Sequence, residues 1–169
     1  MKVQIKLNTD DVINIELYPE VAPKTVENFM NLVRSGFYKN TVFHRVIKGF
    51  MIQTGGYKIE NNTLLEQGDA SSIPGEFTSN GFKNDLKHEL GVISMARTSD
   101  PNSASSQFFI CSGTANWLDG QYAAFGRTID EASNEVVLKI ANVPTMNIGG
   151  GFSDFPTFDI AIEDIKEIK

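Results

Sequence analysis

The chain has 169 residues, of which 41% are hydrophobic and 21% are charged. This composition is typical of a globular protein and excludes a disordered one, and the length suits one domain over residues 1–169. The formal net charge is -6, and the sequence has no basic stripe with interleaved aromatic residues. Nucleic-acid binding is therefore not expected.

Cysteine usage and the N-terminal segment bear on the cellular compartment. Cys111 is the single cysteine, so the chain cannot form an internal disulfide. It lies in the apolar run FFICS, where we expect a buried small hydrophobe rather than a reactive thiol. The opening segment MKVQIKLNTDD lacks the long apolar stretch and cleavage site of a secretory signal, and no stretch approaches a membrane span. We expect a cytoplasmic protein without membrane contact.

The first third of the chain predicts a hairpin followed by a helix. Apolar and polar residues alternate over 3–7 and again over 12–17, with a turn-prone segment between them, which indicates two antiparallel strands. Pro23 is tolerated in the first turn of a helix, and Gly36 is well placed to end one. The buried stripe of this helix is expected to consist of Val26, Phe29, Met30 and Val33.

The stretch FHRVIKGFMIQ, residues 43–53, places one permanent cation, Arg45, among apolar side chains. Such a guanidinium either extends to water or lies at a binding pocket. The pattern predicts a hairpin, for which two loop lengths are open. A three-residue loop over 48–50 would set Arg45 opposite Gln53 on one face, whereas a two-residue loop over 48–49 would send them to opposite faces. Turn chemistry does not choose between the two.

The middle of the chain alternates between loops and short strands. The segment 54–85 has no sustained period, so we expect a functional loop or short strands, such as one near 76–77. The run GVISMAR, residues 91–97, predicts a strand. In the following run SQFFICS, a period of two places one set of side chains on one face and the other set on the opposite face. The first set is Gln107, Phe109 and Cys111, and the second is Phe108 and Ile110.

The last third predicts a turn at 117–120, a strand over 121–129 and a second helix. Asp130 is a suitable N-cap for this helix, which is expected to run to about Ala141. Alternation of apolar residues over 158–162 predicts a final strand.

Four motifs occur in this order along the chain: FHRVIKGFMIQTGG, GVISMARTSD, SSQFFICSG and WLDGQYAAFGR. Together they resemble the cyclophilin family of peptidyl-prolyl cis-trans isomerases, and its bacterial branch in particular, over nearly the whole chain. The resemblance implies a mainly β fold, a closed eight-stranded antiparallel β-barrel capped by two α-helices. It also implies an enzyme that accelerates rotation about X-Pro bonds and assists protein folding.

The resemblance carries roles onto individual residues of this sequence. Arg45 matches the catalytic arginine, and Gln53 matches the amide that contacts the substrate backbone. Ala96 and Arg97 match the strand whose main chain pairs with the bound peptide. The apolar cup for the proline ring is implied to consist of Phe50, Met51, Phe109 and Leu118, with Gln107 and Trp117 at its rim. These roles favour the three-residue loop, because that loop places Arg45 and Gln53 on one face.

Three positions depart from the family pattern. Lys48 stands where the family often has proline, and Arg97 stands where many members have asparagine. Tyr122 replaces a histidine common in the eukaryotic branch and is expected to supply a hydroxyl and an aromatic wall to the substrate site. Trp117 agrees with the members that bind cyclosporin, which implies inhibition by that drug.

The implied partners are proline-containing peptides and unfolded or partly folded proteins, and we expect a monomer. No metal or other cofactor is expected, because His44 and His88 are far apart and lack ligand spacing with Cys111. We expect His44 to be a hydrogen-bonded structural residue. Two other functions stay open at this point. The same groove would serve a binding module that holds proline segments without turnover, and a β-barrel is able to carry a small hydrophobic ligand inside.

Overall fold

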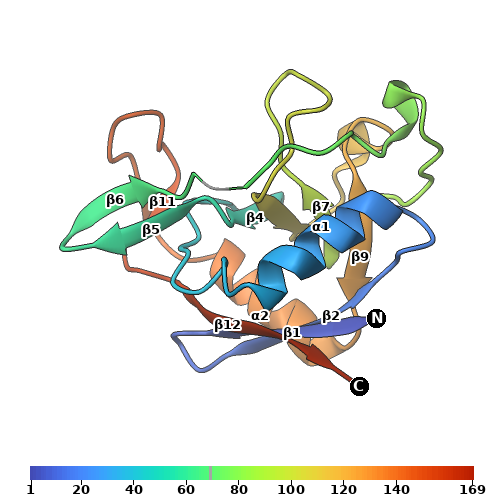
Figure 1. Cartoon of the computed structure of the whole chain (residues 1–169). Coiled ribbons are helices and arrows are strands. Elements are labelled where there is room, and N and C mark those ends of the chain that lie inside the picture. The colour runs from blue at the N-terminus through green and yellow to red at the C-terminus, as the bar shows by residue number, and fades with distance from the viewer. Residues whose placement is uncertain (69) are drawn as a thin grey trace.

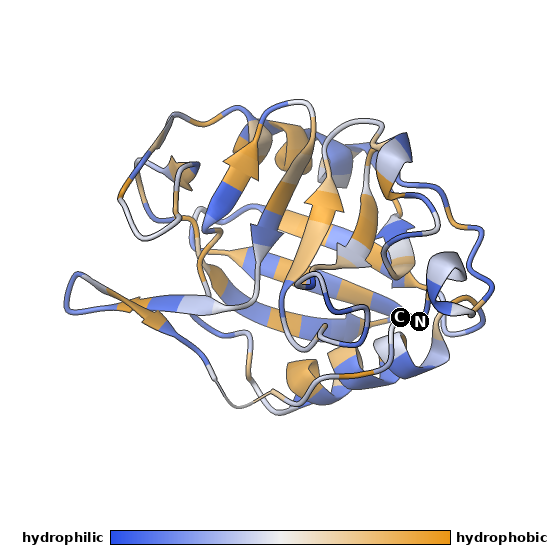
Figure 2. Cartoon of the chain, turned by 90° about the horizontal axis from the view of Figure 1, so that it is seen from above, coloured by the Kyte–Doolittle hydropathy of each residue, from blue (hydrophilic) through white to orange (hydrophobic). Residues whose placement is uncertain are grey.

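The computed structural model describes residues 1–68 and 70–169, which are organised around one eight-stranded antiparallel sheet (Figure 1). Its strand order is β12-β1-β2-β9-β7-β8-β4-β3. In chain order the strands are β1 (Lys2–Leu7), β2 (Val12–Leu17), β3 (Arg45–Ile47), β4 (Met51–Thr54), β7 (Val92–Met95), β8 (Phe108–Cys111), β9 (Ala124–Thr128) and β12 (Ile162–Ile168). The helices are α1 (Pro23–Arg34) and α2 (Glu131–Ala141), which lie on opposite sides of the curled sheet (Figure 2).

The sheet curls until its two edge strands meet. The seam lies just before β3 and at the start of β12, where Val42 and Ala161 form an isolated antiparallel bridge. Three backbone bonds cross it: from Phe43 N to Ile160 O and from Ile162 N to Thr41 O, both 2.9 Å long, and from Asn40 N to Ile162 O, 2.7 Å long. The predicted eight-stranded antiparallel barrel with two helices is confirmed. Its closure is looser than predicted, because this short seam replaces a continuous ladder between β3 and β12.

The interior of the barrel is filled by aromatic and branched side chains. Phe29 of α1 lies at the centre, with its ring 5.4 Å from the rings of Tyr38, Phe108 and Phe125. All four side chains are almost fully buried. This packing explains why the apolar stripe of α1 faces the sheet, and it leaves no support for the alternative of a ligand carried inside the barrel.

We expect Phe29→Ala to lower the free energy of unfolding by about 3–5 kcal/mol, because it removes a ring from a fully packed core. Urea unfolding at neutral pH measures this change. Phe158→Ala is the matched control, since that ring is 49% exposed and its removal is expected to change the stability by less than about 0.5 kcal/mol. Equal losses in the two variants would contradict the assignment of Phe29 to the core.

A hydrogen-bond acceptor from outside α1 satisfies donors in the first turn of this helix. The buried carboxylate of Glu76 accepts hydrogen bonds from the backbone N–H and the hydroxyl of Thr25, both 2.7 Å long. This satisfies one of the backbone donors that a helix N-terminus leaves free. At the other end, Gly36 adopts φ +75 and its N–H donates to Val33 O. The predicted helix and its glycine terminator are confirmed.

Helix α2 begins as predicted at Asp130, whose side chain accepts a 2.8 Å hydrogen bond from the backbone N–H of Ser133. Ser133 in turn fastens the helix to β2, because its hydroxyl accepts a 2.8 Å bond from the backbone N–H of Asn14. The helix ends at Ala141. Its buried side includes Val137, Ile140 and Ala141. Val136, which precedes them, is only half-buried.

Several elements differ from the sequence predictions. Residues 76–77 do not form a strand. The side chain of Glu76 instead accepts the hydrogen bonds from the first turn of α1. The segment 54–85 instead holds a hairpin of β5 (Tyr57–Glu60) and β6 (Thr63–Glu66). The predicted last strand at 158–162 is displaced, since β12 begins at Ile162. Short elements not predicted as such are η1 (Thr78–Asn80), η2 (Asn116–Leu118), β10 (Thr145–Met146) and β11 (Phe155–Pro156).

In the described part of the chain, neither helix combines the length and the apolar character that crossing a membrane requires.

Candidate active site

The hairpin that carries Arg45 has the three-residue loop. Arg45 pairs with Gln53 and Ile47 pairs with Met51 across β3 and β4. Gly49 occupies the left-handed position with φ +75, and the loop closes with a 3.1 Å bond from the N–H of residue 50 to Ile47 O. The two-residue alternative is wrong. Arg45, Met51 and Gln53 consequently share the outer face of the barrel wall.

Strand β8 separates two apolar clusters, as its alternation predicts. Phe108 and Ile110 belong to the barrel interior. Phe109 and Cys111 belong to a second cluster on the outer face, together with Met51, Ala115 and Leu118. Phe109 is only 4% exposed and forms the floor of this outer cluster. The outward face of an antiparallel sheet is usually polar, so an apolar cluster on the outer face marks a binding surface.

A pocket of about 180 Å³ opens over this cluster. Nine residues line it, and all of them were predicted as site residues: Arg45, Phe50, Met51, Gln53, Ala96, Arg97, Phe109, Leu118 and Tyr122. The edge of the Tyr122 ring meets the ring of Phe109 at a centroid distance of 6.0 Å and an angle of 81°. The pocket is thus an apolar cup with two arginines, Arg45 and Arg97, in its lining.

The polar side of the cup is a chain of three side chains. Nη1 of Arg45 lies 3.5 Å from Oε1 of Gln53, and Nε2 of Gln53 donates a 2.9 Å bond to Oε1 of Gln107. Arg45 is exposed, and the long contact to Gln53 holds it only weakly. Its donors are therefore available to a molecule in the cup.

The main chain at the end of β7 offers free hydrogen-bonding groups. Ala96 N–H donates to Gln107 O at 3.0 Å. Among the described residues, neither Ala96 C=O nor Arg97 N–H has a hydrogen-bond partner. The Arg97 side chain is held elsewhere, with its guanidinium 4.5 Å from the centre of the Tyr122 ring and 2.7 Å from Gln121 O. A backbone donor and acceptor thus remain for an extended peptide beside the cup.

Two predicted residues do not line the cup. Gln107 lines a neighbouring polar pocket together with Gln53 and the segment 96–98. Trp117 is 61% exposed, and its ring lies 5.3 Å from the ring of Phe50. Both lie next to the cup rather than in its wall, as expected of a rim.

Comparisons with known proteins agree with this site. Residues 2–167 match the model of the family described as cyclophilin type peptidyl-prolyl cis-trans isomerase/CLD. The chain belongs to the cyclophilin family. Among its relatives are peptidyl-prolyl cis-trans isomerases of Acinetobacter baylyi, 44% identical over 87% of this chain and 75% of that one, and Escherichia coli, isomerase B, 37% identical over 96% and 97%. The predicted enzyme class and family are confirmed.

Solved cyclophilins share the fold. A Cryptosporidium parvum cyclophilin type peptidyl-prolyl cis-trans isomerase, crystallised in the presence of the dipeptide Ala-Pro, superposes with a TM-score of 0.77 at 32% identity. The match covers 98% of this chain and 97% of that one. Cyclophilin AquaCyp293 from Hirschia baltica gives a TM-score of 0.73 at 25% identity, over 98% and 73% of the two chains.

Sequence reasoning missed a buried polar network beneath the cyclophilin cup. The ring of His88 stacks under Phe109, with centroids 6.0 Å apart and an angle of 20°. Its Nδ1 lies 3.0 Å from Asp119 Oδ1, and its Nε2 lies 2.9 Å from Ser94 Oγ. Because His88 is 1% exposed, the network supports the floor of the cup and does not reach substrate. The partners are distant in sequence, so no local pattern signals the network.

Cys111 lies on the same outer face but is buried, and burial raises the pKa of its thiol to about 12. The prediction that Cys111 is buried is confirmed, and the raised pKa is that of a thiol which stays neutral at physiological pH. Within residues 1–68 and 70–169, no group of three or more histidine, cysteine and acidic side chains is arranged to hold a metal ion.

The two histidines make the stability of this cyclophilin depend on pH. Burial lowers the pKa of His44 to about 4, with a smaller effect from the charge of Arg45, and burial also lowers the pKa of His88. The unfolded chain therefore binds more protons than the folded chain below about pH 6.5. We expect stability to be constant above that pH and to fall as the pH drops towards 4, by about 3 kcal/mol for His44 alone.

Urea unfolding at pH 7 and pH 4.5 measures this loss, and an NMR titration of the two imidazole rings assigns it. Equal stability at the two pH values, or imidazole rings that titrate near pH 6.5, would show that burial does not hold the rings neutral.

Proposed function

We propose that the cup receives a proline ring and that Arg45 stabilises the twisted state of the peptide bond before it. The observation that carries this proposal is that Arg45 and the apolar ring of Phe109 line the same pocket. The cup is small and its floor is apolar, as a proline ring requires. Of its two guanidinium groups, that of Arg97 is held by the Tyr122 ring and Gln121 O, whereas that of Arg45 is held only weakly.

The reaction needs no covalent step. Rotation about an X-Pro bond meets a barrier of about 18–20 kcal/mol, because twisting destroys amide resonance. In the twisted state the prolyl nitrogen becomes pyramidal and regains a lone pair that the planar amide lacks. A donor aimed at that nitrogen acts only in the transition state. Arg45 suits this role because a guanidinium stays charged at every working pH and its donors lie in one plane.

The free energies required are modest. Raising a rate of order 0.01 per second to hundreds per second takes about 6 kcal/mol, at 1.36 kcal/mol per tenfold change. One preorganised charged donor supplies about 3–4 kcal/mol. The remaining 2–3 kcal/mol, roughly, must come from holding the peptide on both sides of the rotating bond and from excluding water.

The residue before the proline is held by the main chain next to the cup. Ala96 C=O and Arg97 N–H lack partners within the described chain, so they are free to pair with an extended peptide. The side-chain amide of Gln53 lies between this main chain and Arg45, because it bonds Gln107 and approaches the guanidinium. With the proline ring in the cup and the preceding residue held by this main chain, the peptide bond between the two residues would remain free to rotate.

Exchange NMR on acetyl-Ala-Ala-Pro-Ala-amide tests the proposal. We expect the wild-type protein to accelerate exchange between the cis and trans peptide and to shift the amide signals of Ala96 and Arg97. Saturable binding of the peptide without acceleration would favour a binding module for proline segments. Acceleration without shifts at Ala96 and Arg97 would remove the main-chain contact from the account.

We also propose that cyclosporin inhibits the enzyme, because Trp117 stands exposed at the rim beside Phe50. The exchange assay with added cyclosporin measures this, and Trp117→Ala is expected to weaken the inhibition. Monomeric state and cytoplasmic location stay predictions from the sequence. Sedimentation equilibrium tests the first, and cell fractionation tests the second. Unfolded or partly folded proteins are the proposed natural substrates, and faster refolding of a protein limited by proline isomerisation would support them.

A further inference from the structure

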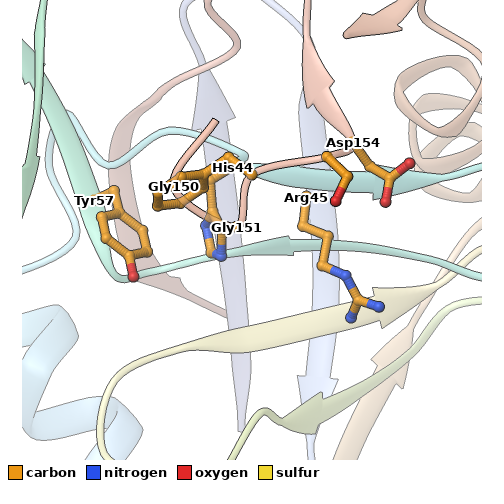
Figure 3. A pocket seen from close by; sticks show the side chains of 8 residues that line it. His44, Arg45, Tyr57, Gly150, Gly151 and Asp154 are labelled. Atoms are coloured by element: carbon orange, nitrogen blue, oxygen red, sulfur yellow. The ribbon is translucent and has the colours of Figure 1, made fainter. Parts of the chain in front are cut away.

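A second, larger pocket of about 380 Å³ adjoins the cup on the other side of Arg45 (Figure 3). It lies against the outer edge of β3, where Val46 N–H donates a 3.0 Å bond to Asp154 O and fastens the loop before β11. The residues that line it are His44, Arg45, Tyr57, Gly150, Gly151, Phe152, Ser153 and Asp154. Arg45 lines both pockets, so the two are continuous along the surface.

Three aromatic rings form the wall of this second pocket. The rings of His44 and Tyr57 lie 4.7 Å apart, and the ring of Phe152 lies 5.0 Å from Tyr57. His44 is buried as expected, but the prediction that it is hydrogen-bonded is wrong for Nδ1, which has no partner among the described residues. Burial and the neighbouring Arg45 hold the pKa of His44 near 4, so this wall is polar but uncharged at neutral pH.

The one acidic side chain that lines the second pocket is Asp154. Its carboxylate makes no salt bridge and accepts no side-chain hydrogen bond within residues 1–68 and 70–169. The one cation that lines the pocket, Arg45, extends away from His44 and Asp154 in Figure 3 and approaches Gln53 instead. A half-buried carboxylate thus remains available to a bound molecule.

The position of the second pocket relative to the cup indicates which part of a bound peptide would reach it. The free main-chain groups of residues 96–97 follow β7, and the proposed function assigns them to the residue before the proline. The strand order β7-β8-β4-β3 places β3 on the opposite flank of the cup. An extended peptide that enters over residues 96–97 and fills the cup therefore leaves over β3, past Arg45.

We propose, building on the function proposed above, that the second pocket binds the residues that follow the proline and prefers basic side chains there over acidic ones. Aromatic walls and an unpaired carboxylate suit a lysine or arginine side chain. An acidic side chain would meet the carboxylate of Asp154, from which the guanidinium of Arg45 extends away.

Exchange NMR on four peptides tests this subsite. Acetyl-Ala-Ala-Pro-amide ends at the proline, two others add Lys-Lys or Glu-Glu after it, and the fourth carries Lys-Lys before Ala-Pro. We expect KM to be about three- to fivefold lower for Lys-Lys than for Glu-Glu after the proline, with equal kcat, because an exposed charge contact acts on binding alone. Asp154→Asn is expected to reduce that difference below about twofold.

Asp159→Asn is the matched control, because it removes the same charge from an exposed residue outside the pocket. It is expected to keep the full preference, which separates the subsite from general attraction by the acidic surface. Lys-Lys before the proline is expected to give the same KM in wild-type protein and in Asp154→Asn.

Amide shifts give an independent readout. The amide signals of Gly150, Gly151 and Ser153 are expected to move with the Lys-Lys peptide and not with the peptide that ends at proline. Equal KM for the Lys-Lys and Glu-Glu peptides, or the same preference in Asp154→Asn, would overturn the subsite while short-peptide exchange still upholds the isomerase site. If no peptide is accelerated, the function proposed above fails, and the shifts at Gly150, Gly151 and Ser153 alone decide whether the second pocket binds peptide.

Discussion

Arg45→Ala is expected to reduce prolyl isomerisation by at least about a hundredfold, because it removes the charged donor that is available at the cup. The other guanidinium there, of Arg97, is held by Gln121 O and the Tyr122 ring. Exchange NMR at a fixed peptide concentration measures the loss. Lys48→Ala is the matched control, since it removes an exposed cation from the same hairpin without touching the pocket. A variant that retains more than a tenth of the wild-type activity would remove Arg45 from the mechanism.

The same substitution is expected to leave the fold intact. Arg45 is exposed and its contact with Gln53 is 3.5 Å long, which is at the limit of a useful hydrogen bond. Truncating such a surface side chain changes stability by less than about 0.5 kcal/mol. Urea unfolding of Arg45→Ala therefore distinguishes a chemical role from a structural one.

Phe109→Ala is expected to weaken peptide binding as well as the rate. Phe109 is 4% exposed and lines the cup, so a proline ring in the cup would rest against its ring. Losing that contact costs about 2–3 kcal/mol of binding, or roughly 30- to 150-fold in affinity. Titration of a proline peptide followed by amide shifts measures the affinity, and unchanged binding would contradict the assignment of the cup.

Phe109→Ala also uncovers the ring of His88, which stacks beneath it, and is expected to destabilise the protein by about 3–5 kcal/mol. Phe109→Leu keeps much of the volume and separates the two effects. We expect Phe109→Leu to restore most of the stability and only part of the affinity, because a branched aliphatic side chain fills the floor but lacks the flat ring face.

The strand faces were predictable where alternation was strict. In β8, Phe108 and Ile110 enter the barrel core while Phe109 and Cys111 form the cup, as a period of two requires. The loop length of the Arg45 hairpin was not predictable from its turn residues. Val46 packs in the core and Ile47 packs against the cup, so both faces of this hairpin are apolar and no alternation fixes its register.

The features that sequence reasoning missed depend on contacts between distant segments. The hairpin of β5 and β6 has no buried face, so its residues show no alternation. Glu76 caps α1 by a hydrogen bond to Thr25, 51 residues earlier in the chain. Asp119 lies within hydrogen-bond distance of His88, 31 residues earlier. The second pocket likewise brings the loop at 150–154 against β3. Only the folded chain places these groups together.

The central claim is that Arg45 acts on the twisted bond and not on the planar substrate. Arg45→Lys tests it most directly, because lysine keeps the charge but loses the planar set of donors. The measurement is exchange NMR of a saturated peptide complex, which gives the dissociation constant and the interconversion rate on the enzyme together. We expect the dissociation constant to change less than about threefold and the interconversion rate to fall at least about tenfold. An unchanged interconversion rate, or an equal loss in affinity and rate, would contradict the account.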